Sequence, residues 1–117
     1  MYDENNIFAK IIKGEVFCEK VYEDENVLFF NDINPVAKIH VLGIPKNNYI
    51  DFSDFILKSD SNTVSQFFEK VDIVIDKLGI KKKGYRIIFN SGVDGGQEVP
   101  HFHVHILGGE KIGIKKA

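Results

Sequence analysis

Three of the four histidines in this chain stand at every second position, in the stretch His101-Phe102-His103-Val104-His105. A β-strand sends alternate side chains to opposite faces, so this spacing predicts that the three imidazole rings share one face. Phe102, Val104 and Ile106 would share the other face and pack into the core. Imidazole acts as a nucleophile, a general acid or base, or a metal ligand near neutral pH. The spacing indicates a catalytic or metal-binding surface, with an ordinary solvent-facing strand as the plain alternative.

A metal site is one interpretation of this pattern. Residues two apart on a strand are about 6.6 Å apart at the backbone, so three in a row cannot easily ligate one ion. If the strand already begins at Glu98, this side chain would point to the face opposite the histidines. The only cysteine, Cys18, lies far away in sequence. We therefore expect neither a metal nor another cofactor, and zinc binding stays open as an alternative.

Phosphoryl chemistry is the interpretation that the preceding residues favour. Gly92, Gly95 and Gly96 come shortly before the histidines, and glycine allows conformations that bring backbone N–H groups close to an anion. A neutral imidazole is a competent nucleophile at phosphorus, and neighbouring imidazoles can orient it or donate a proton. The glycine loop and the histidine strand together predict a phosphate site.

The elements that position these residues can be read from hydrophobic periodicity. A short helix should begin at Asn5 or Asn6 and end near Gly14, and a long helix over residues 59–78 should be capped by one of residues 59–61. The long helix should cover the face of the sheet that carries Phe102. Strand patterns cover residues 17–23, 27–31, 38–44, 85–90 and 99–107. Strands on both sides of a long helix favour the α+β class with an antiparallel sheet.

Composition limits the class of protein. The chain has 117 residues, which suits a single domain over residues 1–117. Its net charge of −2 gives no support to an electrostatic nucleic-acid binder, and no apolar run has the length of a membrane span. The polar, acidic start is unlike a signal peptide. A lone cysteine suits a reducing compartment, so we expect a cytoplasmic protein.

Residues 101–107 read His-φ-His-φ-His-φ-φ, where φ is apolar, and this run resembles the signature of the histidine triad (HIT) family of nucleotide hydrolases and transferases. The flanking residues 90–109, with Asp94-Gly95-Gly96-Gln97 and Leu107-Gly108-Gly109, are similar to the Hint branch of that family. The similarity extends over nearly the whole chain. It implies an α+β fold with a five-stranded antiparallel sheet and one long and one short helix. It also implies a homodimer in which the sheet continues from one subunit to the other.

The activity that this resemblance implies is hydrolysis of a purine nucleoside 5′-phosphoramidate, typically adenosine 5′-monophosphate (AMP) joined to an amine. His103 would attack the α-phosphorus and form a covalent nucleotidyl-histidine, while backbone N–H groups of the last strand would hold the phosphate oxygens. His101 would lie at the phosphate and the leaving group. His105, together with His40 from a neighbouring strand, would form the supporting hydrogen-bond network.

The resemblance also implies a set of substrate contacts. Asp32 would accept hydrogen bonds from the ribose hydroxyls, although the residue taken alone reads as an ordinary turn aspartate. Gln97 and Asn90 are neutral and could bind the phosphate or the leaving group. The further candidates for substrate contact are Gly96, Val99 and the apolar base and ribose surround of Ile7, Phe8, Ile11, Phe30, Ile33 and Leu42.

Two features depart from the pattern of many Hint proteins. Glu98 stands where the animal proteins have a serine near the phosphate, and a carboxylate there should repel an anionic substrate. We expect its side chain either to turn away or to meet the amine of a cationic leaving group. Many Hint proteins also carry a C-terminal extension that reaches the partner's active site, and we expect none after the short basic tail here.

Several other functions remain open at this level. Within the family, a dinucleoside polyphosphate hydrolase is the nearest alternative. A uridylyltransferase-like protein fits less well, because those enzymes carry glutamine in place of the third histidine and are much longer. A non-catalytic nucleotide-binding scaffold protein is the alternative from a different functional class.

Overall fold

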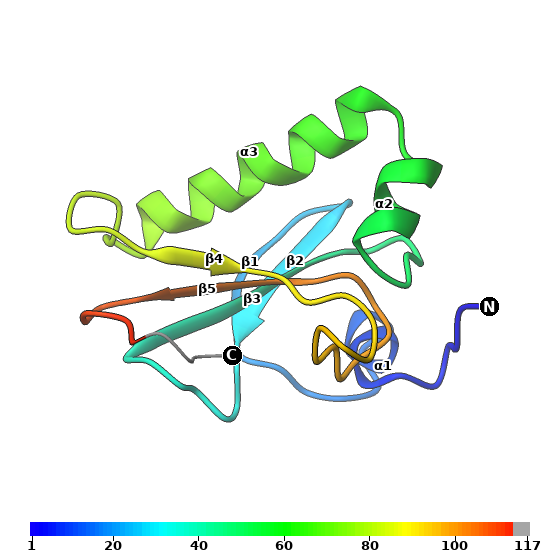
Figure 1. The fold of residues 1–117 in the computed structure, drawn as a ribbon, viewed down its shortest axis with the longest axis horizontal. Coiled ribbons are helices and arrows are strands. Elements are labelled where there is room, and N and C mark those ends of the chain that lie inside the picture. The colour runs from blue at the N-terminus through cyan, green and yellow to red at the C-terminus, as the bar shows by residue number, and fades with distance from the viewer. Residues whose placement is uncertain (114–117) are drawn as a thin grey trace.

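The computed structural model describes residues 1–113, which build a five-stranded antiparallel sheet with helices on both faces (Figure 1). The strands are β1 (Lys20–Glu23), β2 (Val27–Asn31), β3 (Ile39–Pro45), β4 (Arg86–Ile88) and β5 (Val104–Gly108), in the spatial order β1-β2-β3-β5-β4. The helices are α1 (Ile7–Ile12), α2 (Phe52–Lys58) and α3 (Ser61–Lys77). The predicted α+β class with an antiparallel sheet is confirmed.

The long helix α3 lies along one face of the sheet (Figure 1). It begins two residues later than predicted, because the Asp60 carboxylate accepts a hydrogen bond from the backbone N–H of Thr63 at 2.8 Å and caps the first turn. Its apolar stripe packs against alternate residues of the histidine segment, as the periodicity predicts. The shared core contains Phe67, Val71, Val74 and Ile75 of α3 with Phe102, Val104 and Ile106.

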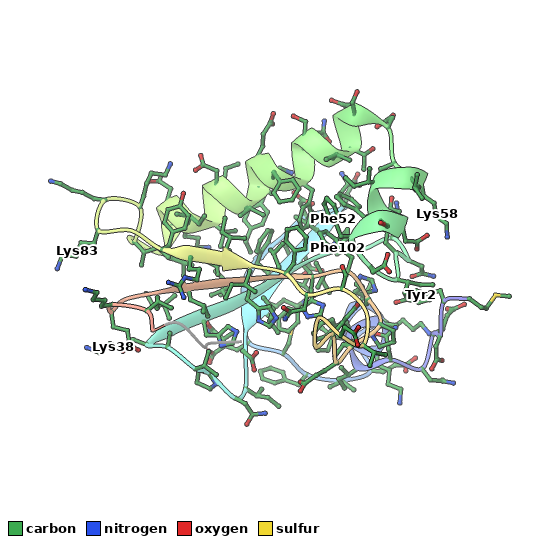
Figure 2. All side chains as sticks on the ribbon, in the orientation of Figure 1. Tyr2, Lys38, Phe52, Lys58, Lys83 and Phe102 are labelled. Carbon is green, nitrogen blue, oxygen red and sulfur yellow. The ribbon has the colours of Figure 1, made fainter. Side chains whose placement is uncertain are left out.

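A second short helix, α2, corrects the expectation of only one short helix. Asp51 caps its start by accepting from the N–H of Asp54 at 2.9 Å, and Lys58 forms an ion pair with Asp54 near its end. The helix places the fully buried Phe55 in a stack on Phe102, with ring centroids 4.8 Å apart. Figure 2 shows Phe102 and Phe52 where α2 meets the sheet. Its seven residues offer too few turns for a clear apolar period.

The opposite face of the sheet carries α1. Of the two candidate caps, Asn6 is the one used, because its side-chain oxygen accepts from the N–H of Ala9 at 2.9 Å. Phe8 and Ile11 of α1 pack with Phe30 of β2 and Leu42 of β3 in a second apolar cluster, separate from the core under α3. The sheet therefore has a packed face under α3 and a face on which α1 covers only part of the surface.

The last strand is shorter than predicted, and this changes how two of the histidines are held. β5 begins at Val104, not at residue 99. Pro100 has no N–H to donate, the N–H of His101 donates to Val99, and the N–H of Phe102 donates to Tyr49 outside the sheet. His105 alone of the three histidines therefore lies in the sheet ladder, opposite Leu42 and Ile88. The predicted strands over residues 17–23 and 85–90 are likewise shortened to β1 and β4.

Among residues 1–113, no helix combines the length and the apolar character that crossing a bilayer requires. The expectation about a C-terminal extension falls in part on residues 114–117, which lie outside the described residues.

Candidate active site

A pocket of about 490 Å³ opens on the sheet face that carries α1. Its lining comes from α1 and the connection to β1, from β2 and the turn after it, from β3, and from β5 and the segment before it. Thirteen of the fifteen predicted site residues are among them. These are His103, His105, His40, Asp32, Asn90, Gly96, Val99, Phe30, Ile33, Ile7, Phe8, Ile11 and Leu42. The two that do not line the pocket are His101 and Gln97.

One end of the pocket is apolar. Phe8 from α1 meets Phe30 from β2 edge to face, with ring centroids 5.6 Å apart. Val16, Phe17 and Cys18 extend this wall and were not predicted as site residues. Phe17 and Cys18 fall within the strand that the sequence predicts over residues 17–23, and Val16 directly precedes it. Because Phe17 is 87% exposed, the apolar end reaches the surface and could take a flat aromatic ligand.

Asp32 lines the pocket and directly follows β2. One carboxylate oxygen accepts from the N–H of Asn34 at 2.8 Å, which is the ordinary role of a turn aspartate. The other lies 3.3 Å from Nε2 of His40. The carboxylate is only half-buried and lines the cavity, so it retains acceptor capacity toward a ligand.

The protonation pattern of His103 follows from its neighbours. Its Nδ1 lies 2.7 Å from the backbone carbonyl oxygen of His101. A carbonyl oxygen can only accept, so Nδ1 carries the proton and donates it. In the neutral ring the other nitrogen, Nε2, then holds a free lone pair. Phe8 packs edge to face on this ring at 4.9 Å and fixes its plane.

His101 lies behind the pocket wall, contrary to its expected place at the phosphate. The ring is fully buried, and both of its nitrogens have protein partners. Nε2 donates to the carbonyl oxygen of Pro45 at 2.8 Å, and Nδ1 accepts from the hydroxyl of Tyr2 at 2.5 Å. Tyr2, labelled on the N-terminal segment in Figure 2, was not predicted as part of the site. His101 thus holds the carbonyl that orients His103 instead of facing a ligand.

His40 and His105 form a directed hydrogen-bond pair across β3 and β5. Nδ1 of His40 accepts from the N–H of Val36 at 3.1 Å, so its proton lies on Nε2. That Nε2–H donates to Nδ1 of His105 at 2.9 Å. The remaining proton of His105 therefore lies on Nε2. The ring centroids of His105 and His103 are 5.1 Å apart, and both residues line the pocket.

Burial keeps these rings neutral. It lowers the pKa of His101 and of His105 to about 4, and it also lowers the pKa of His103 and of His40. The nearby Asp32 carboxylate opposes the effect on the pKa of His40, but burial is the larger cause. At neutral pH all four imidazoles are therefore uncharged, which is the state that a nucleophilic ring nitrogen requires.

The glycine loop is built differently from the expected phosphate cradle. Gly96 has φ +78°, a left-handed conformation that glycine adopts without strain. Its N–H donates to Val93, and the N–H of Gln97 donates to Gly92, so these two donors are used within the loop. The Gln97 side chain accepts from the N–H of Gly92 and donates to the carbonyl oxygens of Ile50 and Val99. Gln97 thus fastens the loop to the body of the protein.

Glu98 lines the pocket with an exposed side chain. Its place in the lining leaves both expectations for this residue, turning away or meeting a cationic leaving group, as predictions. Its negative charge, like that of Asp32, acts to raise the pKa of His103 against the larger effect of burial. Three further lining residues carried no separate signal in the sequence: Asn31, the last residue of β2, and Asn34 and Val36 from the β2–β3 connection.

Within residues 1–113, Asp32, His40 and His105 form a group that could hold a metal ion. One ligand atom from each lies within 4.8 Å of the others. A cation there would replace the proton that His40 shares with His105. The histidine spacing in the sequence did not predict this set, because only one member, His105, comes from the run over residues 101–105.

Comparison with known proteins supports a common origin for this arrangement. The model of the HIT domain matches residues 13–112. An uncharacterized HIT-like protein, RP317, of Rickettsia prowazekii is 46% identical over 112 residues, which cover 96% of this chain and 93% of that protein. A histidine triad protein from Clostridium difficile has a solved structure with a TM-score of 0.88 at 42% identity, covering 99% of this chain and all of that one.

A second solved structure, described as a HIT family hydrolase from Legionella pneumophila, has a TM-score of 0.87 at 38% identity and covers 93% of this chain and 96% of its own. The matched segment contains all four histidines and the turn with Asp32. Sequence, fold and pocket agree, and the chain belongs to the HIT domain family.

Proposed function

We propose that this protein hydrolyses purine nucleoside 5′-phosphoramidates of the AMP–amine type, through a covalent nucleotidyl intermediate on Nε2 of His103. The observation that carries the proposal is the state of His103: a neutral ring with its proton fixed on Nδ1, at the wall of the pocket. The Legionella relative is described as a hydrolase, which supports a hydrolytic reaction.

The substrate would lie along the pocket with its base in the apolar end. Phe8, Phe30 and Ile33 offer flat and branched apolar surfaces to a purine. Asp32 lies between this end and the histidines, and its carboxylate can accept from both hydroxyls of a ribose. A nucleoside held at these two points would present its 5′-phosphate to His103.

The reaction takes two displacements at the α-phosphorus. In the first, the Nε2 lone pair of His103 forms a bond to phosphorus, the phosphorus–nitrogen bond to the amine breaks, and the departing nitrogen takes up a proton. In the second, the oxygen of a water molecule bonds to phosphorus and the bond to Nε2 breaks. The water protons are released, and AMP leaves. Covalent catalysis divides one difficult substitution into two easier ones.

The neighbouring groups serve these steps. The backbone carbonyl of His101 stabilises the positive charge that develops on His103 when Nε2 bonds to phosphorus, because Nδ1–H donates to it. The Nε2–H of His105 can donate to a phosphate oxygen or to the departing nitrogen. Asn90 and Gly96 line the same end of the pocket and add neutral contacts.

We also propose a homodimer through the β4 edge of the sheet. β4 is an edge strand of the described sheet, and exposed edges offer unpaired N–H and C=O groups. Tyr85, Ile87 and Phe89 on and beside β4 are partly exposed apolar side chains. Sedimentation of the wild type and of Ile87→Lys tests this: a dimer that the substitution dissociates supports it, and a monomeric wild type rejects it.

Kinetics of His103→Ala test the reaction. Hydrolysis of an adenosine phosphoramidate by the wild type should persist in the presence of a chelator. The variant should lose at least about a thousandfold in kcat, as expected when a covalent nucleophile is removed. Glu25→Gln, a surface change outside the pocket, is the matched control and should retain activity. Equal activity of His103→Ala and the wild type would reject the nucleophile. Loss of wild-type activity with chelator would instead indicate a metal at Asp32, His40 and His105.

A further inference from the structure

The charge of the pocket wall is unusual for a phosphate site. Among its twenty described lining residues the only formally charged side chains are Asp32 and Glu98, and no lysine or arginine is present. The lining histidines are neutral at pH 7, because burial lowers their pKa values. Sites that bind several phosphate groups commonly use arginine, lysine or a metal ion. This wall carries two negative charges instead.

The two carboxylates differ in their structural roles. Asp32 is held by the turn after β2 and lies 3.3 Å from Nε2 of His40. Glu98 makes no hydrogen bond and no ion pair with any other residue of the described chain. It lines the pocket and its side chain is exposed to solvent. The fold therefore gives no structural reason for an acidic residue at this position.

We infer that Glu98 is a specificity-determining residue that favours substrates whose leaving amine carries a positive charge. This inference rests on the proposed function, because it assumes a nucleotidyl group bound with its phosphorus at His103. In an in-line displacement, the leaving amine departs on the side of phosphorus opposite Nε2. The base and ribose would fill the apolar end of the pocket, so the amine would extend toward the solvent-exposed part of the lining. Glu98 belongs to that part, and its charge acts on His103.

Charge balance gives the direction of the preference. A phosphoramidate of AMP carries one negative charge at phosphorus, and Glu98 and Asp32 disfavour it. An ammonium group on the leaving amine offsets this repulsion, whereas a polyphosphate leaving group adds to it. Single exposed charge pairs are worth about 0.2–1 kcal/mol, which corresponds to about 1.5- to 5-fold in kcat/KM. The effect should weaken as added salt screens it.

The test uses three AMP phosphoramidates with leaving amines of equal length. They are 1,5-diaminopentane, pentylamine and 5-aminopentanoate, whose far ends are cationic, neutral and anionic. For the wild type, kcat/KM should fall in that order, by about 1.5- to 5-fold per step. Glu98→Gln keeps the size of the side chain and should flatten the order. Glu98→Lys should invert it. Glu25→Gln removes a carboxylate outside the pocket and should leave the order unchanged.

The order of kcat/KM in Glu98→Gln decides the inference. If it matches the wild-type order, Glu98 does not recognise the charge of the leaving group. Binding of the same compounds to His103→Ala, with and without Glu98→Gln, separates this result from failure of the proposed reaction. If the wild type hydrolyses none of them, the proposed reaction fails. A charge-dependent affinity that disappears with Glu98→Gln still supports the role of Glu98, and a charge-independent affinity overturns it.

Discussion

The buried histidine His101 makes a quantitative prediction about stability and pH. Its ring is fully buried between the Tyr2 hydroxyl and the Pro45 carbonyl, and burial lowers its pKa from an ordinary value of 6.5 to about 4. The unfolded chain therefore binds a proton that the folded chain does not bind between these two pH values. Stability is present above pH 6.5 and is lost as the pH falls through this window.

The magnitude follows from the two pKa values. With 6.5 in the unfolded chain and about 4 in the folded chain, linkage gives a loss of about 2.5 kcal/mol between pH 7.5 and pH 4.5 from this group. The steepest loss, about 1.2 kcal/mol per pH unit, should fall near pH 5. This is a large fraction of the stability of a small domain.

Urea denaturation of the wild type and of His101→Gln at several pH values measures this contribution. The glutamine amide can still donate to Pro45, but it does not titrate. Between pH 7.5 and pH 4.5 the free energy of unfolding of His101→Gln should therefore fall by about 2.5 kcal/mol less than that of the wild type. Any difference in the free energy of unfolding between the two proteins that does not depend on pH cancels, because only the change with pH is compared. Parallel curves for the two proteins would refute the assignment of His101 as a buried neutral ring.

Three other predictions follow from the site and the core. Asp32→Asn should weaken binding of AMP by about tenfold or more, since hydrogen bonds to a charged acceptor are worth about 1.5–3 kcal/mol. Calorimetry should show a smaller loss for 2′-deoxy-AMP, which keeps only the 3′-hydroxyl, and equal losses for both would argue against a contact with the 2′-hydroxyl. The kcat/KM of the wild type should stay level as the pH falls through 6.5 and decline only in more acidic solution, because burial lowers the pKa of His103 and that of His105 to about 4; a decline centred at pH 6.5 would contradict this. Gly43→Ala should destabilise the fold by about 1–3 kcal/mol, because its Cβ would lie 2.3 Å from Cε2 of Phe29; an unchanged urea midpoint would show that the ring can move aside.

The sequence predicted the elements that are long enough to show a regular repeat of apolar residues. The α3 stripe and the alternate residues Phe102, Val104 and Ile106 pack as expected, because burial on one face leaves a period that the sequence displays. The short helix α2 escaped prediction, since its seven residues contain a single fully buried side chain, Phe55. The first strand was overextended, because an apolar run reads the same whether it pairs in a sheet or lines a pocket.

In the candidate site, the sequence predicted which residues meet but not how they are protonated. The spacing of the histidines brought His103 and His105 to one pocket, but their protonation states depend on partners distant in sequence. The hydrogen bond from Tyr2 to His101 spans 99 positions, and the one from His40 to His105 spans 65. No local pattern contains such pairings. They arise from the order of the strands and from the path of the chain between Val99 and Val104.

The most direct test of the proposed mechanism is to trap the intermediate. The wild type is mixed with an adenosine phosphoramidate, quenched in alkali within the first turnover, digested, and its peptides are mapped by mass spectrometry. We predict an AMP adduct on His103, whose Nε2 holds the free lone pair. An adduct on another histidine, or full product formation with no adduct at any time within the first turnover, would contradict the proposed mechanism.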